Sequence, residues 1–289
     1  MLINQTDDME ARLKNEARYL IKKYPNVAFN CNNSQDPASG SREGKEYLLA
    51  SGGYIVVPEN YHDKVIKKYK ALLTPNSKFY EDNKHKYNII LTNGPVNGNN
   101  YYALDTIKGY DERVNGICAM YKIYKTGRAG DILGMRQWFM TNLPVGGKIQ
   151  KHCYGPQAWG GNMYKGYIKG HPNCLANLEA LGNYRFSLAM EPMYHNLWSV
   201  DWVTERLWNA FKCKTVPVYY GCFNIEKKVP KDLYIDYRDF ASLGDLAKFL
   251  ISFNKSRWID MTEKAYDWYY NECKISRMPD LEDILRSCQ

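Results

Sequence analysis

The chain of 289 residues is long enough for two domains, each with its own hydrophobic core. Hydrophobic residues make up 45% and aromatic residues 14% of the composition, which excludes an intrinsically disordered chain. The formal net charge of +8 favours an anionic partner, but the basic residues are scattered instead of forming one patch. A small molecule that carries phosphate therefore fits the charge as well as a nucleic acid does.

The first part of the chain alternates helical patterns with short apolar runs. We expect helices over 8–24 and 61–73, strands over 26–30 and 87–92, an apolar stretch over 47–57 and a loop over 32–43 that is rich in Asn, Ser and Gly. The strand over 87–92 is short, apolar and ended by the turn residues Asn93, Gly94 and Pro95.

The second part alternates strands and helices more regularly. We expect strands over 117–123, 148–154, 185–189, 215–220 and 233–235, and helices over 130–143, 175–183, from about 203, over 243–252 and over 260–272. Such alternation predicts an α/β fold with a doubly wound parallel sheet.

The eight cysteines and the N-terminal segment indicate a reduced location. The cysteines form no CxxC pair, which argues against a zinc ribbon, and Cys118, Cys153 and Cys213 lie in apolar runs typical of core thiols. Residues 1–24 read as a charged helix without the apolar region of a signal peptide, and no run approaches the roughly 18 apolar residues of a membrane span. We expect a soluble, cytoplasmic protein.

A strand, loop, helix and strand follow one another over residues 184–222. A right-handed crossover makes the two strands parallel, so the loop and the helix start share the sheet edge where ligands bind. Thr204, Glu205 and Arg206 fall at this helix start, where free N–H groups suit phosphate and a carboxylate could accept ribose hydroxyls. Ordinary capping by Thr204 and Glu205, with a solvated Arg206, explains the pattern equally well.

This segment resembles the donor-binding motif of the α-1,3-fucosyltransferases, glycosyltransferase family 10, in the order and spacing of its strands and its Thr204-Glu205 pair. Residues 104–112 are similar to a segment that precedes the crossing between domains in bacterial members. The resemblance implies a GT-B fold, in which two Rossmann-like domains face a cleft. Residues 1–112 would be the acceptor-binding domain and 113–289 the nucleotide-sugar donor-binding domain, and the last helix can cross back to the first.

The resemblance also implies which residues bind the nucleotide sugar: Arg136, Gly155, Glu191, Trp202, Val203, Thr204, Glu205, Arg206, Tyr220 and Gly221. Arg136 and Arg206 would take up the charge of the diphosphate; Arg206 stands where the family has Lys, and Trp202 stands where it has Tyr. A surface arginine on an amphipathic helix is the less favoured alternative for Arg136.

Two positions depart from the family pattern. Pro192 replaces an Asn that contacts the donor, and Pro95 falls at the position of the family's catalytic Glu. Asp105 and Asp111 are the nearest candidate bases, although each also fits a cap of a turn or helix, and the lone His152 and His195 are commonly structural residues. An Asp-x-Asp is absent from the sequence, so we expect no metal site and no obligatory cofactor.

The sequence therefore favours an inverting glycosyltransferase that moves a sugar from GDP-fucose to a hydroxyl of an oligosaccharide or glycoprotein glycan, as in bacterial or virus-encoded members, the latter acting in the host cytoplasm. A UDP-sugar such as UDP-xylose is an alternative donor. A non-catalytic nucleotide- or glycan-binding module is the alternative of another class, favoured by Pro95 and Pro192. Nucleic-acid binding rests on net charge alone, so we expect no such partner.

Overall fold

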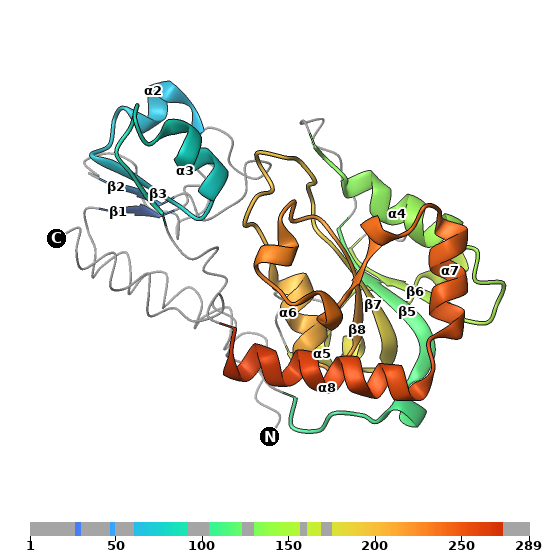
Figure 1. Cartoon of the computed structure of the whole chain (residues 1–289). Coiled ribbons are helices and arrows are strands. Elements are labelled where there is room, and N and C mark those ends of the chain that lie inside the picture. Colours follow the sequence, from blue (N-terminus) through green and yellow to red (C-terminus); the bar gives the residue numbers. More distant parts are fainter. Residues whose placement is uncertain are drawn as a thin grey trace, which may run out of the picture.

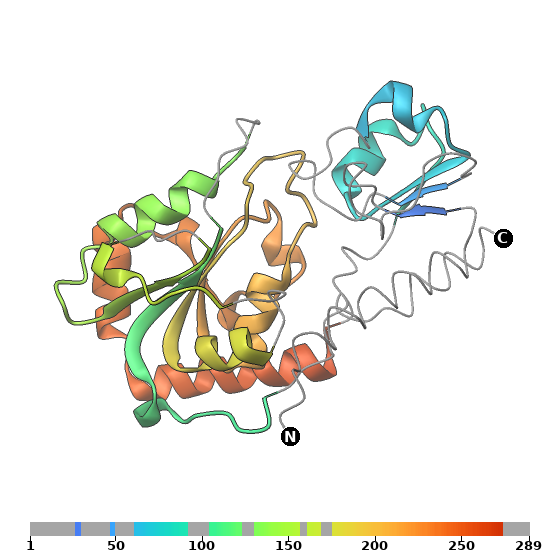
Figure 2. The same ribbon diagram turned by 180° about the vertical axis from the view of Figure 1, so that it is seen from behind.

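The computed structural model describes residues 27–29, 47–49, 61–91, 104–122, 130–156, 161–168 and 175–273. Within these residues the strands form two separate parallel sheets, one with four strands and one with five (Figures 1 and 2). The predicted helix over 8–24, the loop over 32–43 and the turn at Asn93–Pro95 lie outside the described residues.

The first sheet has the order β1-β2-β3-β4. Its strands are β1 (Val27–Phe29), β2 (Tyr47–Leu49), β3 (Ala71–Thr74) and β4 (Ile89–Leu91). The helices α2 (Asp63–Ile66) and α3 (Ser77–Asn83) connect the last three strands and pack with them (Figure 1).

The predicted helix over 61–73 is wrong in its second half. Helix α2 ends at Ile66, and Ala71–Thr74 forms the strand β3, which pairs with β2 on one side and β4 on the other. All four residues of β3 are buried. Because burial between two neighbouring strands stabilises an apolar run more than helix propensity does, the tertiary pairing decided the structure here.

The second sheet has the order β6-β5-β7-β8-β9, and every neighbouring pair is parallel. Its strands are β5 (Val114–Met120), β6 (Gln150–Tyr154), β7 (Tyr184–Met190), β8 (Val216–Tyr220) and β9 (Ile235–Asp236). The predicted doubly wound α/β arrangement is confirmed, although β5 begins and ends three residues before the predicted strand.

Helices cover both faces of this sheet (Figures 1 and 2). Helices α4 (Leu133–Asn142) and α7 (Leu243–Ser252) pack on one face, and α5 (Leu175–Gly182), α6 (Glu205–Lys212) and α8 (Lys255–Asn271) pack on the other. Short 3-10 turns join these elements: η2 (Tyr110–Glu112), η3 (Gly161–Met163), η4 (Ile225–Lys227), η5 (Lys231–Leu233) and η6 (Tyr237–Asp239). The apolar sides of the helices thus pack on both faces of the sheet and form a hydrophobic core on each face.

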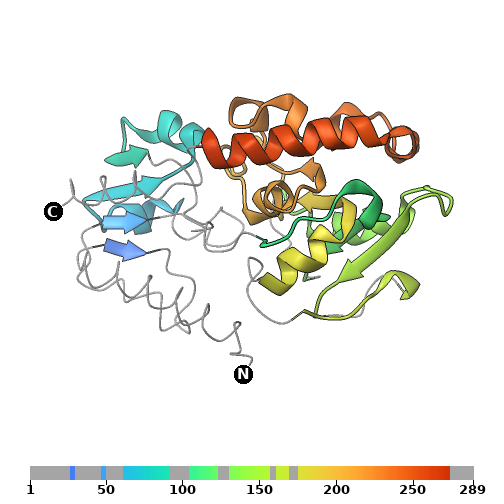
Figure 3. The same cartoon turned by 90° about the horizontal axis from the view of Figure 1, so that it is seen from below.

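Helix α8 begins five residues before its predicted start and lies along α6 (Figure 3). Ala265 and Tyr269 of α8 share a core with Trp208 of α6. The described part of α8 therefore packs with the second sheet, and a crossing back to the first sheet stays a prediction.

The loop after β7 contacts the first sheet's helices. The Asn76 side chain donates a hydrogen bond of 2.8 Å to the carbonyl of Leu197, and the Trp198 ring lies 5.6 Å from Tyr61 and 6.0 Å from Phe79, measured between ring centroids. The backbone N–H of Ser77 also donates to the Asp201 carboxylate over 3.0 Å. The loop that leads into α6 is thereby packed against the first sheet's layer.

Candidate functional site

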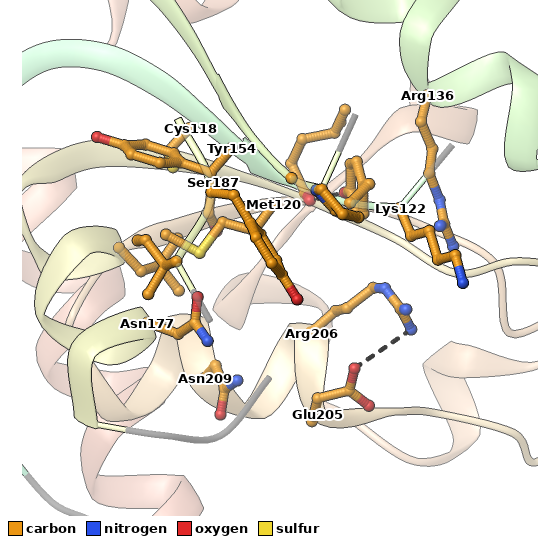
Figure 4. Close-up of a pocket in the computed structure, with 17 residues that line it drawn as sticks. Cys118, Met120, Lys122, Arg136, Tyr154, Asn177, Ser187, Glu205, Arg206 and Asn209 are labelled. Carbon is orange, nitrogen blue, oxygen red and sulfur yellow. Dashed lines mark hydrogen bonds and ion pairs between the residues drawn. The ribbon is translucent and has the colours of Figure 1, made fainter. Parts of the chain in front are cut away.

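A pocket of about 320 Å³ opens at the carboxyl ends of β5, β6 and β7 (Figure 4). Helices α5 and α6 supply one wall, and Arg136 of α4 enters from the other face of the sheet. This is the edge at which parallel α/β sheets bind ligands, and the volume is within the range of small-molecule sites.

Four of the predicted site residues line this pocket: Arg136, Gly155, Glu205 and Arg206. Glu205 is the first residue of α6, so Glu205 and Arg206 stand in its first turn, as predicted from the sequence. Asn209 follows one helical turn later on the same face as Glu205 and lines the pocket too.

The predicted residue Glu191 lies behind the pocket and not in its lining. Its side chain is 0% exposed, and its two oxygens accept hydrogen bonds of 2.7 Å from the backbone N–H and the hydroxyl of Thr204. Arg206 Nη1 donates to the same carboxylate over 3.2 Å. Glu191 therefore holds the start of α6 and the Arg206 guanidinium in position.

Burial, together with the nearby charge of Glu205, raises the pKa of the Glu191 carboxyl overall, although the Arg206 charge and the hydrogen bonds from Thr204 act in the opposite direction. Three donors are aimed at the two carboxylate oxygens, an arrangement that suits the ionised form. An ionised Glu191 compensates the charge of Arg206.

Gly221 packs against Glu191. Its φ is +157°, and a Cβ placed on it would lie 2.2 Å from the Cβ of Glu191, so glycine alone fits this position. The remaining predicted residues are also structural: Trp202 and Val203 are buried in apolar clusters, and the Tyr220 ring stacks on Tyr194 at 4.6 Å.

Tyr121 brings the two arginines of the pocket together. The guanidinium carbon of Arg136 lies 4.4 Å from the Tyr121 ring centroid, and that of Arg206 lies 6.0 Å from it. The Tyr121 hydroxyl donates to the carbonyl of Leu188 and accepts from the backbone N–H of Met190 over 3.0 Å. Because burial raises the pKa of Tyr121 to about 12, the ring stays neutral and offers its face to both cations.

Five other residues of the lining were not predicted as site residues from the sequence: Tyr121 and Lys122, which follow β5 at the carboxyl edge, and Asn177, Ser187 and Asn209 at the other end of the pocket. In the part of the chain that the structure describes, the Ser187 Oγ is buried and has no hydrogen-bond partner. The position of Tyr121 and Lys122 after a central parallel strand is a signal that could have found them.

The two predicted bases lie at the opposite edge of the sheet. Asp105 and Asp111 precede β5, both are exposed, and Asp111 forms an ion pair with Lys255. Arg113, two residues after Asp111, donates to the carbonyl of Tyr184, the first residue of β7, and to that of Cys213, which precedes β8. Since the pocket is at the carboxyl ends of the strands, neither aspartate is placed to act in it.

The two histidines have structural partners. His152 Nδ1 lies 2.8 Å from the Tyr184 hydroxyl, and His195 Nδ1 accepts the backbone N–H of Leu197 over 3.1 Å. Among the described residues, no group of three His, Cys, Asp or Glu could hold a metal ion. The helices in the described ranges include none that is both long and apolar enough to span a membrane.

Comparison with solved structures supports the predicted fold. An α-glucosyltransferase in complex with UDP-glucose and DNA containing an abasic site matches with a TM-score of 0.59 and 12% identity, over 95% of this chain and 84% of that one. An α1,3-fucosyltransferase with GDP matches with a TM-score of 0.52 and 14% identity, over 89% of this chain and 78% of that one. The protein has the α/β fold of the GT-B type of glycosyltransferase.

Comparison of sequences finds similarity to one family of glycosyltransferases. Residues 146–284 match glycosyltransferase family 10 (fucosyltransferase), C-terminal part. The chain is 41% identical over 122 residues to alpha-(1,3)-fucosyltransferase 7 of Rattus norvegicus, which is 38% of this chain and 31% of that protein. It is 34% identical over 109 residues to the human 3-galactosyl-N-acetylglucosaminide 4-alpha-L-fucosyltransferase FUT3, 34% of this chain and 29% of that protein.

The matched segment thus spans under a third of each of these relatives. Residues 146–284 are therefore similar to the C-terminal part of glycosyltransferase family 10, and the chain resembles the α-1,3-fucosyltransferases, as the motif over 184–221 predicted.

Proposed function

We propose that the protein is an inverting glycosyltransferase that moves a sugar from a nucleotide-sugar donor, by similarity GDP-fucose, to a hydroxyl of an oligosaccharide or glycoprotein glycan. The observation that carries this proposal is the pair of arginines, Arg136 and Arg206, that meet over Tyr121 in the pocket. The names of the similar relatives, all fucosyltransferases, support the donor.

The pocket offers a partner for each part of the donor. Arg136 and Arg206 can bind the diphosphate by charge-assisted hydrogen bonds, and the start of α6 adds its positive dipole end. Glu205 can accept the ribose hydroxyls. Asn177 and Asn209 occupy the end of the pocket that is away from Arg136 and can hydrogen-bond a nucleobase (Figure 4).

The reaction needs positive charge where the diphosphate leaves. When the bond between sugar and diphosphate breaks, its electron pair remains on a diphosphate oxygen, while the acceptor oxygen bonds the anomeric carbon from the opposite face and gives its proton to a base. Arg136 is 2% exposed and Glu191 fixes Arg206, so both charges are held in place before the reaction. Preorganised charge of this kind commonly contributes the largest share of catalysis.

The proposed division makes residues 1–112 the acceptor domain and residues 113–289 the donor domain, so the acceptor would bind on the side of the first sheet. The proposed location of the reaction is the cytoplasm. The loop at Leu197 and Trp198 contacts α3 and its cap, so the donor pocket and the first sheet's layer are coupled through one loop. The proposed reaction needs no metal ion. We do not assign the role of general base to Asp105 or Asp111, because both lie at the opposite edge of the sheet from the pocket.

A UDP-sugar such as UDP-xylose is the second candidate donor. Pro192 carries no side-chain amide, and its carbonyl accepts the backbone N–H of Ile132 over 3.0 Å, so this position supports α4 and offers the donor no side-chain hydrogen bond. The alternative function of another class is a module that binds a nucleotide or a glycan without catalysis. Only a measurement of turnover distinguishes such a module from the proposed enzyme.

The test is a donor-cleavage assay on the full chain with GDP-fucose, UDP-xylose, UDP-glucose and UDP-galactose, with and without glycan acceptors and EDTA. One donor should release its nucleoside diphosphate, unaffected by EDTA, and Arg136→Gln should slow the release about 100-fold. Lys248→Gln, which removes a charge 82% exposed on α7, serves as the control. Binding of a nucleotide sugar without its cleavage would favour the non-catalytic module. We expect no transfer of the sugar to a mixed-sequence DNA duplex.

A further inference from the structure

A serine hydroxyl lies buried in the wall of the pocket without a hydrogen bond. Ser187 is 3% exposed and lines the pocket, and its Oγ has no hydrogen-bond partner among the residues that the structure describes. Buried polar side chains are nearly always hydrogen-bonded, because a hydroxyl that leaves water without a new partner costs stability. A buried hydroxyl of this kind beside a cavity indicates a ligand that bonds it.

The position of Ser187 in β7 turns its side chain toward the pocket. Its neighbours Phe186 and Leu188 pack in the core that α4 and α7 share with the sheet. Because successive side chains of a strand point to opposite faces, Ser187 points to the face that α5 and α6 cover. Every residue of β7 from Phe186 to Met190 is buried, and Ser187 is the polar one. The strand thus places one hydroxyl on an otherwise apolar floor.

The groups near Ser187 in the lining are neutral. Cys118 pairs with it on β5, and burial raises the pKa of the Cys118 thiol well above its usual value, so the thiol stays uncharged. Asn177 of α5 and Asn209 of α6 contribute carboxamides to the same lining. Figure 4 shows these groups on one side of the pocket and Arg136 on the other. An uncharged group with hydrogen-bonding atoms fits the side of Ser187, and a phosphate fits the side of Arg136.

We propose that the Ser187 hydroxyl hydrogen-bonds the nucleobase of the donor and contributes to the choice between bases. This inference rests on the proposed function of the pocket. A hydroxyl can donate to a carbonyl oxygen or ring nitrogen of a base and can accept from its N–H groups. A base that bonds Ser187 removes the cost of the unpartnered hydroxyl, whereas a base that does not reach it leaves that cost in place. Ser187 therefore favours the base whose hydrogen-bonding atom reaches its Oγ.

The test compares wild type, Ser187→Ala and the control Ser252→Ala by calorimetric titration of the full chain with GDP and UDP. Ser187→Ala should weaken binding of the nucleotide that the wild type prefers by about fivefold, as expected for one hydrogen bond, and should weaken the other less. The ratio of the two affinities should therefore fall. Ser252 is exposed on α7 and its hydroxyl donates to the carbonyl of Phe249 in the same helix, so Ser252→Ala should keep both affinities.

The melting temperature of the ligand-free protein is the second readout. Ser187→Ala removes a hydroxyl that gains no hydrogen bond on folding, so the melting temperature should stay unchanged or rise. A substitution that only damaged the pocket would instead lower stability and affinity together. The expected combination is weaker binding without a loss of stability.

Four outcomes would overturn the inference. Wild-type affinities of Ser187→Ala would contradict the role of Ser187 and leave the proposed function intact. Equal weakening of GDP and UDP binding would show that the substitution disturbs the whole pocket, and a lower melting temperature would show that the hydroxyl supports the fold; each would contradict the role. A wild-type chain that binds neither GDP nor UDP would overturn the proposed function, and this inference with it.

Discussion

The most informative single substitution in the protein is Glu191→Gln, because it changes one atom of a fully buried carboxylate. The carboxylate accepts hydrogen bonds of 2.7 Å from the N–H and the hydroxyl of Thr204 and pairs with Arg206 at 3.2 Å. An amide would present its NH₂ group to one of these donors and would remove the nearer of the two carboxylates that pair with Arg206. Breaking a buried charge pair from one side costs about 3–5 kcal/mol. Because the Arg206 side chain is 23% exposed, we expect a loss of about 2–4 kcal/mol.

Glu226→Gln is a matched control for this experiment. Glu226 also pairs with an arginine, Arg238, at 3.2 Å, but its side chain is 51% exposed. Exposed pairs of this kind contribute about 0–1 kcal/mol. The free energies of unfolding of wild type and both variants would be measured in urea. If the two variants lost equally little stability, Glu191 would not be the support of α6 that its contacts indicate.

Three further predictions follow from other contacts. Gly221→Ala should destabilise the protein by about 1–3 kcal/mol, since its Cβ would meet Glu191 at 2.2 Å, and an unchanged melting temperature would contradict this. Burial raises the pKa of Asp236, but hydrogen bonds, first among them those from Arg238, lower this pKa overall. The stability that the low pKa provides is present above about pH 4 and is lost as the pH falls further. Asp236→Asn should therefore remove that part of the acid dependence of the free energy of unfolding. Trp198→Ala should lower the free energy of unfolding by about 3 kcal/mol, because the Trp198 ring packs on Tyr61 and Phe79 of the first sheet's layer, and an unfolding curve like that of the wild type would contradict this.

The second sheet could be predicted because its sequence is locally consistent. Each apolar run is short, α6 and α7 are amphipathic, and the segment from Tyr184 to Gly221 alternates strand and helix patterns. Helix α7 accordingly has its predicted bounds. The strand β3 could not be predicted in this way, because Ala71–Thr74 continues a helical pattern and becomes a strand only through its pairing with β2 and β4.

The candidate site was predictable by position but not by role. The order of the elements predicts that Glu205 and Arg206 face the ligand edge, and the structure agrees. The same order does not say whether Glu191 lines the pocket or supports it, since that depends on side-chain packing within the loop. The position of Asp111 in the sequence already argued against its role as a base. A residue that precedes a parallel strand lies at the amino edge of the sheet, away from the edge that binds the ligand.

In the proposed function, the pocket at the carboxyl edge binds a nucleotide sugar through Arg136 and Arg206. A thermal-shift screen of the full chain with GDP, GDP-fucose, UDP, UDP-xylose, UDP-glucose and UDP-galactose tests it most directly, because a ligand that binds only the folded state raises its stability. We predict a rise in melting temperature with the GDP compounds that is lost in Arg136→Gln and kept in Lys248→Gln. A rise with UDP compounds alone would change the donor, and no rise with any nucleotide would contradict the claim.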